Sequence, residues 1–248
     1  MRDRRIGLTD LGPTAEDPQA MSRTDDSDSA ATKAAQLAEV PLCGSFALLV
    51  DELRHKKVCD LGCNDGHYLQ FAGDDSLGLD VSQESLRLCH QRGLQARHHD
   101  LNQLPLPVAD EEFEVVLLSH VLEHVHAPLA MLRECNRILR KNGKLVVGLP
   151  IEDGIYSRLR MDYFGGGEGH LYSFSLRNLS KLLALTGFES ERVICHLPRL
   201  GNRTSVWNDR LHQIFGTRLY SLSAAYWCVA RKVSVPVADH QMSDYFER

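Results

Sequence analysis

Short apolar runs alternate with amphipathic helical patterns between about residue 45 and residue 232, and no other feature restricts the fold as strongly. The run Glu114–Ser119 is nearly continuous in apolar residues, as a strand buried on both faces of a sheet should be. Strands that are separated by helices pair in parallel through right-handed crossovers. The sequence therefore predicts an α/β protein with a doubly wound, mostly parallel sheet.

The predicted elements follow one another in regular order. Strands are expected at Val58–Asp60, Ser76–Asp80, Leu94–His98, Glu114–Ser119, Lys144–Leu149, Phe188–His196 and Ala224–Lys232. Helices are expected at 45–53, between the first two strands, at 83–92, at Pro128–Leu139 and at 176–186, with N-caps at Ser45, Ser82 and Ser175. Lys141, Asn142 and Gly143 are expected to end the helix that begins at Pro128.

A single folded domain with two tails accounts for the 248 residues. We expect a disordered leader at 1–32, the domain at 33–232 and a frayed tail at 233–248. The strand and helix pattern breaks after Pro150, so residues 150–174 are expected to form an insertion that covers the ligand site as a lid. The sequence leaves open whether Met21 is the true start.

Composition and charge argue against several classes of protein. The net charge of -5 gives no electrostatic signature of a nucleic-acid-binding protein. No stretch approaches the ~20 apolar residues of a membrane span, and the first residues lack the apolar run of a signal peptide, so we expect a cytoplasmic protein. The seven cysteines include no C-x-x-C pair, which argues against a disulfide or zinc framework, and Cys59 and Cys63 are expected to be small buried residues.

The stretch Val58–Leu69 is the most informative part of the sequence. An apolar strand ends at Asp60, and a turn that contains Gly62, Asn64 and Gly66 follows it. Glycine accepts a positive φ and lets a ligand approach the backbone, and Asn tolerates the same conformation. Ligands of open α/β sheets bind at the carboxyl ends of the strands, so we expect a ligand site here. The spacing departs from the G-x-G-x-x-G of dinucleotide-binding folds.

Three later segments add polar residues at strand ends. Asp80 ends the second strand, Asp100-Leu101 follows the third, and Ser119-His120-Val121-Leu122-Glu123-His124-Val125 follows the fourth. Together with Asp60 to Gly66 they resemble the class I S-adenosylmethionine-dependent methyltransferases of the ubiquinone-biosynthesis-like group, over roughly residues 45–232. The resemblance implies a Rossmann-like, seven-stranded sheet with an antiparallel last strand, and an enzyme whose cofactor is S-adenosylmethionine. Asn64 stands where the family's first motif has its central glycine.

The resemblance also implies which residues bind the cofactor. Asp60 would bind the ammonium group, Asp80 would accept from the ribose hydroxyls, and Asp100 would accept from the adenine amino group. Leu101 would pack on the adenine ring, and the backbone of the glycine turn would line the methionine part. The full expected set is Asp60, Leu61, Gly62, Cys63, Asn64, Gly66, Asp80, Val81, Asp100, Leu101, Ser119 and His120.

Candidate catalytic residues follow from the implied reaction, an in-line displacement at a sulfonium methyl. Such a step depends mainly on alignment of the acceptor, and a hydroxyl or amine acceptor is helped by a base. The candidates are His170, His120, Glu123, His124 and Tyr172. His170 is favoured because it lies in the covering insertion and imidazole titrates near neutral pH. Glu123 and His124 are expected to open a helix, where a cap and a surface pair explain them equally well, and no metal is expected.

The acceptor is expected to be a small molecule, such as a metabolite, glycan or lipid precursor, methylated at oxygen, nitrogen or carbon. Nucleic acid is disfavoured as a partner, since no Asn/Asp-Pro-Pro-Tyr segment follows the fourth strand. Two explanations account about equally well for a group of polar and aromatic residues late in the chain: they bind an anionic or aromatic substrate, or they form a solvated polar face. The residues are Arg199, Arg203, Trp207, Arg210 and His212. Two alternatives remain: a nicotinamide-dependent oxidoreductase, and a non-catalytic scaffold or regulator of the same fold. The oligomeric state is not predicted.

Overall fold

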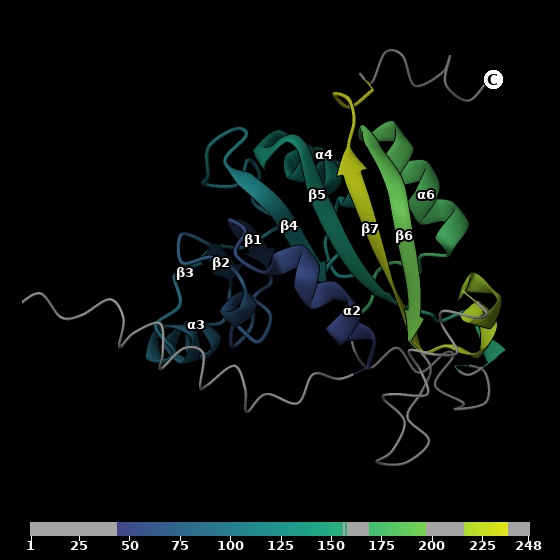
Figure 1. The fold of residues 1–248 in the computed structure, drawn as a ribbon, viewed down its shortest axis with the longest axis horizontal. Coiled ribbons are helices and arrows are strands. Elements are labelled where there is room, and N and C mark those ends of the chain that lie inside the picture. Colours follow the sequence, from purple (N-terminus) through teal and green to yellow (C-terminus); the bar gives the residue numbers. More distant parts are fainter. Residues whose placement is uncertain (1–43, 156, 158–168, 197–215, 238–248) are drawn as a thin grey trace, which may run out of the picture. The chain divides into compact units, whose positions relative to one another are not determined.

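The computed structural model describes residues 44–155, 157, 169–196 and 216–237, which form a seven-stranded sheet (Figure 1). The strands lie in the order β3-β2-β1-β4-β5-β7-β6. Strands β1 to β5 pair in parallel, and β7 runs antiparallel to both of its neighbours. The predicted Rossmann-like, mostly parallel sheet with an antiparallel last strand is therefore confirmed.

The observed strands match the predicted ones closely, with one exception. They span β1 Val58–Leu61, β2 Leu77–Asp80, β3 Ala96–His98, β4 Phe113–Ser119, β5 Leu139–Pro150, β6 Phe188–His196 and β7 Ala225–Lys232. The exception is β5, which was expected to begin at Lys144. It begins earlier because Leu139 already pairs with Phe113, and after an irregularity Lys144 pairs with Val115. The prediction that Lys141, Asn142 and Gly143 separate a helix from the strand is therefore wrong, since they lie within β5.

Four helices and two short 3-10 helices accompany the sheet in the described residues. They span α2 Gly44–Leu53, η1 Leu69–Phe71, α3 Gln83–Gln91, α4 Pro128–Ile138, α6 Leu176–Leu185 and η2 Gly216–Leu222. Ser82 and Ser175 cap α3 and α6 as predicted, and their hydroxyls accept from the backbone N–H groups of Ser85 and Asn178. Ser45 lies inside α2, so its prediction as an N-cap is wrong.

The helix expected between β1 and β2 is reduced to the single turn of η1. The segment between Gly66 and Gly73 holds only six residues, and helix formation needs several residues beyond a costly first turn. The turn after β1 is therefore followed by one short turn of 3-10 helix and irregular backbone.

The sheet packs between helices on both of its faces. Helices α4 and α6 cover one face, and α2 lies on the other (Figure 1). Successive residues of a strand point to opposite faces. Accordingly Leu118 and Val147 belong to one buried cluster with Leu132 of α4 and Leu183 of α6. Val146, which directly precedes Val147 in β5, is fully buried but lies outside that cluster, as expected for a side chain on the opposite face.

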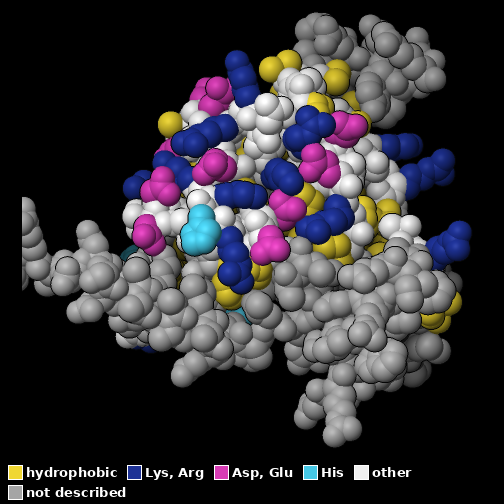
Figure 2. Space-filling view, in the orientation of Figure 1, with side chains coloured by type: hydrophobic (Ala, Val, Ile, Leu, Met, Phe, Trp, Pro, Cys, Tyr) yellow, Lys and Arg dark blue, Asp and Glu magenta, His cyan; other side chains and the backbone are white. Residues whose placement is uncertain are grey.

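The surface carries charges of both signs. Lys and Arg side chains alternate with Asp and Glu across the face shown in Figure 2. Glu52 of α2 connects this helix to the sheet, because its carboxylate lies 2.9 Å from Nζ of Lys144 and 3.2 Å from Nη2 of Arg192. Among the helices of the described residues, none has both the length and the apolar composition needed to cross a membrane.

The segment that follows β7 is hydrogen bonded as far as Val237. The backbone N–H groups of Val233 and Ser234 donate to the carbonyl of Gly187 at 2.9 and 3.2 Å, and that of Val237 donates to Leu185 at 2.9 Å. The first part of the expected tail is thus held against the end of α6. The expected leader at 1–32, residues 156 and 158–168 of the expected lid, and residues 238–248 lie outside the described residues.

Candidate active site

The turn after β1 has the backbone conformation that its residues predict. The φ angles are 75° at Gly62, 47° at Asn64 and 78° at Gly66. The backbone N–H of Gly62 donates to Leu79 at 2.7 Å, which ties the turn to β2. A Cβ on Gly62 would lie 2.6 Å from Cγ2 of Val121, so the loop after β4 packs directly on the turn. The carboxyl ends of β1, β2 and β4 therefore meet at this point.

Asp60 is a buried carboxylate without a partner. Its side chain is 0% exposed, and neither oxygen accepts a hydrogen bond. Burial, and next the charge of Asp80, raise the pKa of Asp60 from 3.8 to about 7. A buried carboxylate that lacks a partner costs free energy. It is therefore suited to a ligand that supplies a cationic or hydrogen-bond-donating group.

Asp80 closes the turn from the neighbouring strand. Its two carboxylate oxygens each accept one backbone hydrogen bond at 2.8 Å, from the N–H groups of Asn64 and Ser82. A carboxylate has about four acceptor positions, so each oxygen retains one for a ligand hydroxyl. The next residue, Val81, is 61% exposed, so its apolar side chain faces solvent beside this carboxylate. A carboxylate and an apolar surface thus lie side by side.

Asp100 and Leu101 follow β3 at the same edge of the sheet. Asp100 accepts a hydrogen bond from the backbone N–H of Asn102 at 2.9 Å, and Leu101 is partly buried against the core. The Asn102 side chain accepts from the N–H of His126 at 2.8 Å and so connects this turn to the loop after β4. The backbone N–H of His99 also donates to the backbone carbonyl of Asp80 at 2.9 Å, which holds the turn near β2.

The end of β4 places Ser119 and His120 beside an aromatic side chain that sequence reasoning missed. His120 has a positive φ of 55°, and its N–H donates to Gly148 at 3.0 Å. Gly148 pairs with Trp227 of β7, whose ring lies over the glycine and contacts the rings of His120 and Tyr68 edge to face. The pairing of β5 with β7 joins residues far apart in sequence, so no local pattern indicated that Trp227 belongs to this site.

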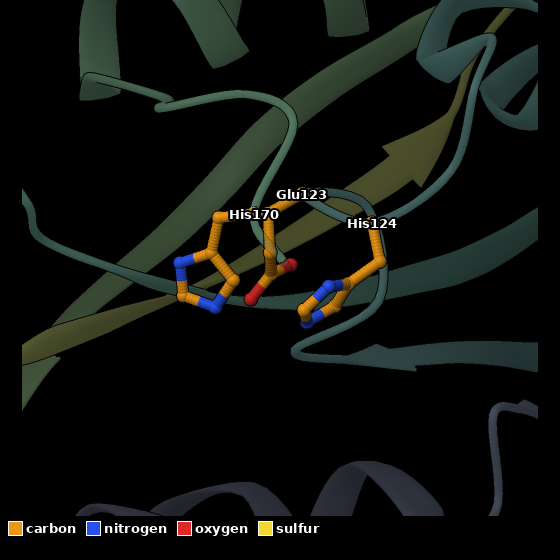
Figure 3. Close-up of side chains that lie close together, drawn as sticks. All are labelled: Glu123, His124 and His170. Carbon is orange, nitrogen blue, oxygen red and sulfur yellow. The ribbon is translucent and has the colours of Figure 1, made fainter. Parts of the chain in front are cut away.

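Glu123, His124 and His170 form a cluster of side chains that point toward one another (Figure 3). Glu123 and His124 lie in a turn, so the prediction that they open a helix is wrong. The helix begins only at Pro128, a residue favoured at the first helical position. Glu123 is 0% exposed, which also rules out the expected surface pair. Nδ1 of His120 lies 3.3 Å from Oε1 of Glu123, without the alignment of a hydrogen bond.

The described end of the insertion is docked on the loop after β4. The backbone N–H of Leu171 donates to the carbonyl of Glu123 at 2.8 Å, and the Tyr172 hydroxyl donates to the carbonyl of His126 at 2.9 Å. The side chains of Leu171 and Tyr172 are nevertheless 55% and 40% exposed. The insertion therefore adds an apolar and aromatic surface next to the cluster of Glu123, His124 and His170.

The cysteines near the turn are packing residues. Cys59 and Cys63 are buried, and burial is the main cause that raises the pKa of both thiols. Neither thiol is therefore an activated nucleophile. The other residues considered for the acceptor, Arg199, Arg203, Trp207, Arg210 and His212, lie outside the described residues, as do Gly165, Gly166 and Gly167.

Comparison with known proteins shows what the segment around this site is similar to. Residues 59–147 match the family described as a methyltransferase domain. The chain is 29% identical, over 146 residues, to a Mycolicibacterium smegmatis protein named a probable S-adenosylmethionine-dependent methyltransferase, with 55% of this chain and 53% of that protein aligned. It is 31% identical over 111 residues to the ubiquinone biosynthesis O-methyltransferase of Methylococcus capsulatus, with 42% of this chain and 47% of that enzyme aligned.

A solved structure shows the same fold. The S-adenosylmethionine-dependent methyltransferase of Mesorhizobium loti superposes with a TM-score of 0.54 at 19% identity, covering 82% of this chain and 99% of that one. The sequence alignments with four curated relatives cover 40% to 53% of their lengths, about half of each protein. Residues 59–147 of this chain therefore resemble the methyltransferase-domain family, and the similar proteins include ones named as S-adenosylmethionine-dependent methyltransferases.

Proposed function

We propose that this chain transfers the methyl group of S-adenosylmethionine to an oxygen, nitrogen or carbon atom of a small-molecule acceptor. The observation that carries the proposal is the Asp60 carboxylate, which is buried and without a partner just before the glycine turn. The aligned relatives named as methyltransferases support the same conclusion.

The residues around the turn fit the parts of this cofactor. The ammonium group of its methionine part would give Asp60 the charged partner that the carboxylate lacks. The positive φ angles of Gly62 and Gly66 allow the backbone to approach a ligand closely. Asp80 has acceptor positions left for ribose hydroxyls, and the exposed Val81 offers an apolar surface for the adenine ring. Beyond β2, at the end of β3, Asp100 and Leu101 remain the proposed adenine contacts.

Bound S-adenosylmethionine supplies an electrophilic methyl group on a positively charged sulfur. The task of the chain is then to align the acceptor atom with that methyl group and to keep water away, and alignment of this kind is worth up to ~7–11 kcal/mol. As the new bond to the methyl carbon forms, the bond from sulfur to carbon breaks and its electron pair remains on sulfur. A hydroxyl or amine acceptor also releases a proton.

His120 is the best placed of the proposed bases. Its imidazole is partly exposed at the end of β4, next to Trp227 and to the turn that would hold the cofactor. Tyr172 already uses its hydroxyl proton on the carbonyl of His126, which suits a wall of the acceptor site better than a base. Trp227, Leu171 and Tyr172 together favour an acceptor with an apolar or aromatic part.

Calorimetric titration with S-adenosylhomocysteine, and separately with NAD, tests the proposal. We expect one site for S-adenosylhomocysteine and none for NAD on the wild-type chain. Asp80→Ala should weaken binding at least about tenfold, because one lost charged hydrogen bond costs ~1.5–3 kcal/mol. Asp51→Ala, which removes a carboxylate that is 89% exposed on α2, is the matched control and should bind as the wild type does. Failure of the folded wild type to bind S-adenosylhomocysteine would overturn the proposal.

A further inference from the structure

The cluster of Glu123, His124 and His170 has the donor set and spacing of a metal site. One ligand atom from each residue lies within 4.8 Å of the other two. Two imidazoles and one carboxylate form the set that holds zinc in several hydrolytic enzymes, with a fourth position left open for water or substrate. We propose that these three residues bind a divalent transition-metal ion, with Zn²⁺ the best match. From the sequence alone, no metal was expected at these residues.

The buried carboxylate of Glu123 provides independent support. The side chain is 0% exposed, and neither oxygen accepts a hydrogen bond. Burying such a group is costly unless it is paired or coordinates a metal. The other charged group that faces it is His120, whose Nδ1 lies 3.3 Å away and carries a positive charge only when protonated. A divalent ion supplies the compensating charge at every pH at which the imidazoles are neutral.

Both histidines are oriented by hydrogen bonds on their Nδ1 atoms. Nδ1 of His170 lies 2.5 Å from Oε1 of Glu152, and Nδ1 of His124 lies 3.3 Å from the carbonyl oxygen of Gly169. Metal-binding histidines usually donate their second ring N–H to a carboxylate or a carbonyl in this way. We assign the Nε2 atoms of the two rings as the nitrogen ligands, and Figure 3 shows the rings on either side of the Glu123 carboxylate.

The backbone holds the two parts of the cluster together. Leu171, the neighbour of His170, donates its N–H to the carbonyl of Glu123 at 2.8 Å. The His124 and His170 rings pack edge to face with their centres 4.7 Å apart. Zinc with bonds of ~2.0–2.1 Å requires ligand atoms ~3.4 Å apart, so small side-chain movements complete the site. Because His170 comes from the insertion, an ion would also fasten the insertion to the loop after β4.

The ion has a role in acceptor binding if the proposed methyl transfer holds. Glu123 of the cluster lies in the loop that follows β4, three residues beyond the proposed base His120. An oxygen atom of the acceptor that occupies the open position becomes more acidic, as water bound to zinc does. The site therefore favours acceptors that carry a hydroxyl group able to coordinate a metal.

Zinc binding by the full chain tests the site without any methyl transfer. Zn²⁺ affinity is measured by competition with a chromophoric chelator, on the wild type and on Glu123→Gln, His124→Asn and His170→Asn. We expect the wild type to bind Zn²⁺ tightly at one site, and each of these three variants to bind it at least about 100-fold more weakly. Glu152→Gln should weaken Zn²⁺ binding by only about tenfold. Co²⁺ should give the visible absorption bands of a tetrahedral site in the wild type alone. Mg²⁺, which prefers oxygen ligands, should not compete.

His126→Asn is the matched control, since this exposed histidine lies two residues from His124 and is not part of the cluster. It should bind Zn²⁺ as the wild type does. The circular dichroism spectrum and the melting temperature of each variant confirm that it folds. Wild-type affinity in the three cluster variants would overturn the metal site. S-adenosylhomocysteine binding by the wild type is measured in parallel. A wild-type chain that binds zinc but not S-adenosylhomocysteine contradicts only the proposed function. A wild-type chain that binds S-adenosylhomocysteine but not zinc contradicts only the metal site.

Discussion

At the scale of single residues, Asp60 opposes the stability of the ligand-free fold. The carboxylate is buried without a hydrogen bond, and its pKa is raised from 3.8 to about 7. Between these two pH values the folded protein keeps a proton that the unfolded chain releases. Stability therefore falls as the pH rises from about 4 to 7 and stays low above that range. The rise in pKa corresponds to at most ~4 kcal/mol.

Asp60→Asn should remove this cost. We expect the free energy of unfolding of the variant to exceed that of the wild type by up to ~4 kcal/mol at pH 8 and by much less at pH 4.5. Urea denaturation of both proteins at the two pH values measures the difference. The variant should also lose affinity for S-adenosylhomocysteine. An equal difference in stability at both pH values would show that Asp60 does not titrate as we describe.

Gly62 gives a second test at the residue scale, because two requirements for glycine coincide there. Gly62 and Gly93 have similar positive φ angles of 75° and 71°, but a Cβ on Gly62 would lie 2.6 Å from Val121 whereas one on Gly93 meets nothing within 4 Å. Gly93→Ala should cost ~1–2 kcal/mol of strain, and Gly62→Ala a further ~1–3 kcal/mol of crowding. Equal losses in thermal denaturation would contradict the close packing of the turn.

At the scale of elements, strands β5 and β7 cooperate to place Trp227. The Trp227 ring lies over Gly148, where an added Cβ would come within 2.6 Å of it. We expect Gly148→Ala to destabilise the protein by ~1–3 kcal/mol and to move the ring. In a double-mutant cycle the cost of Gly148→Ala should shrink once Trp227→Leu has removed the ring. Additive losses in urea denaturation would show that the two positions are not coupled.

The elements also show how far local sequence patterns predict a structure. Strand positions, the caps Ser82 and Ser175 and the parallel order of the sheet followed from hydrophobic runs and turn residues. The helix expected before β2 did not form beyond η1, because the six residues between Gly66 and Gly73 are too few for more than a short turn. Glu123 was expected to open a helix, as a cap or as part of a surface pair, but it is buried, and the insertion, distant in sequence, docks on its carbonyl.

At the scale of the whole molecule, the sheet collects residues from strand ends that are far apart in sequence. That the candidate cofactor residues lie at one edge of the sheet was predictable, since they stand at or just after the carboxyl ends of parallel strands. Trp227 and the grouping of His170 with Glu123 were not predictable, because they depend on the pairing of β5 with β7 and on the path of the insertion. Such contacts arise only once the chain has folded.

The most direct test of the account is a crystal structure of the chain with S-adenosylhomocysteine. The account predicts that the ligand lies over the glycine turn, with its amino group at Asp60 and its ribose hydroxyls at Asp80. Its sulfur should then face the acceptor side, toward His120 and Trp227. A ligand bound elsewhere, or an Asp60 carboxylate that remains without a partner in the complex, would contradict the central claim that this buried acid is part of the cofactor site.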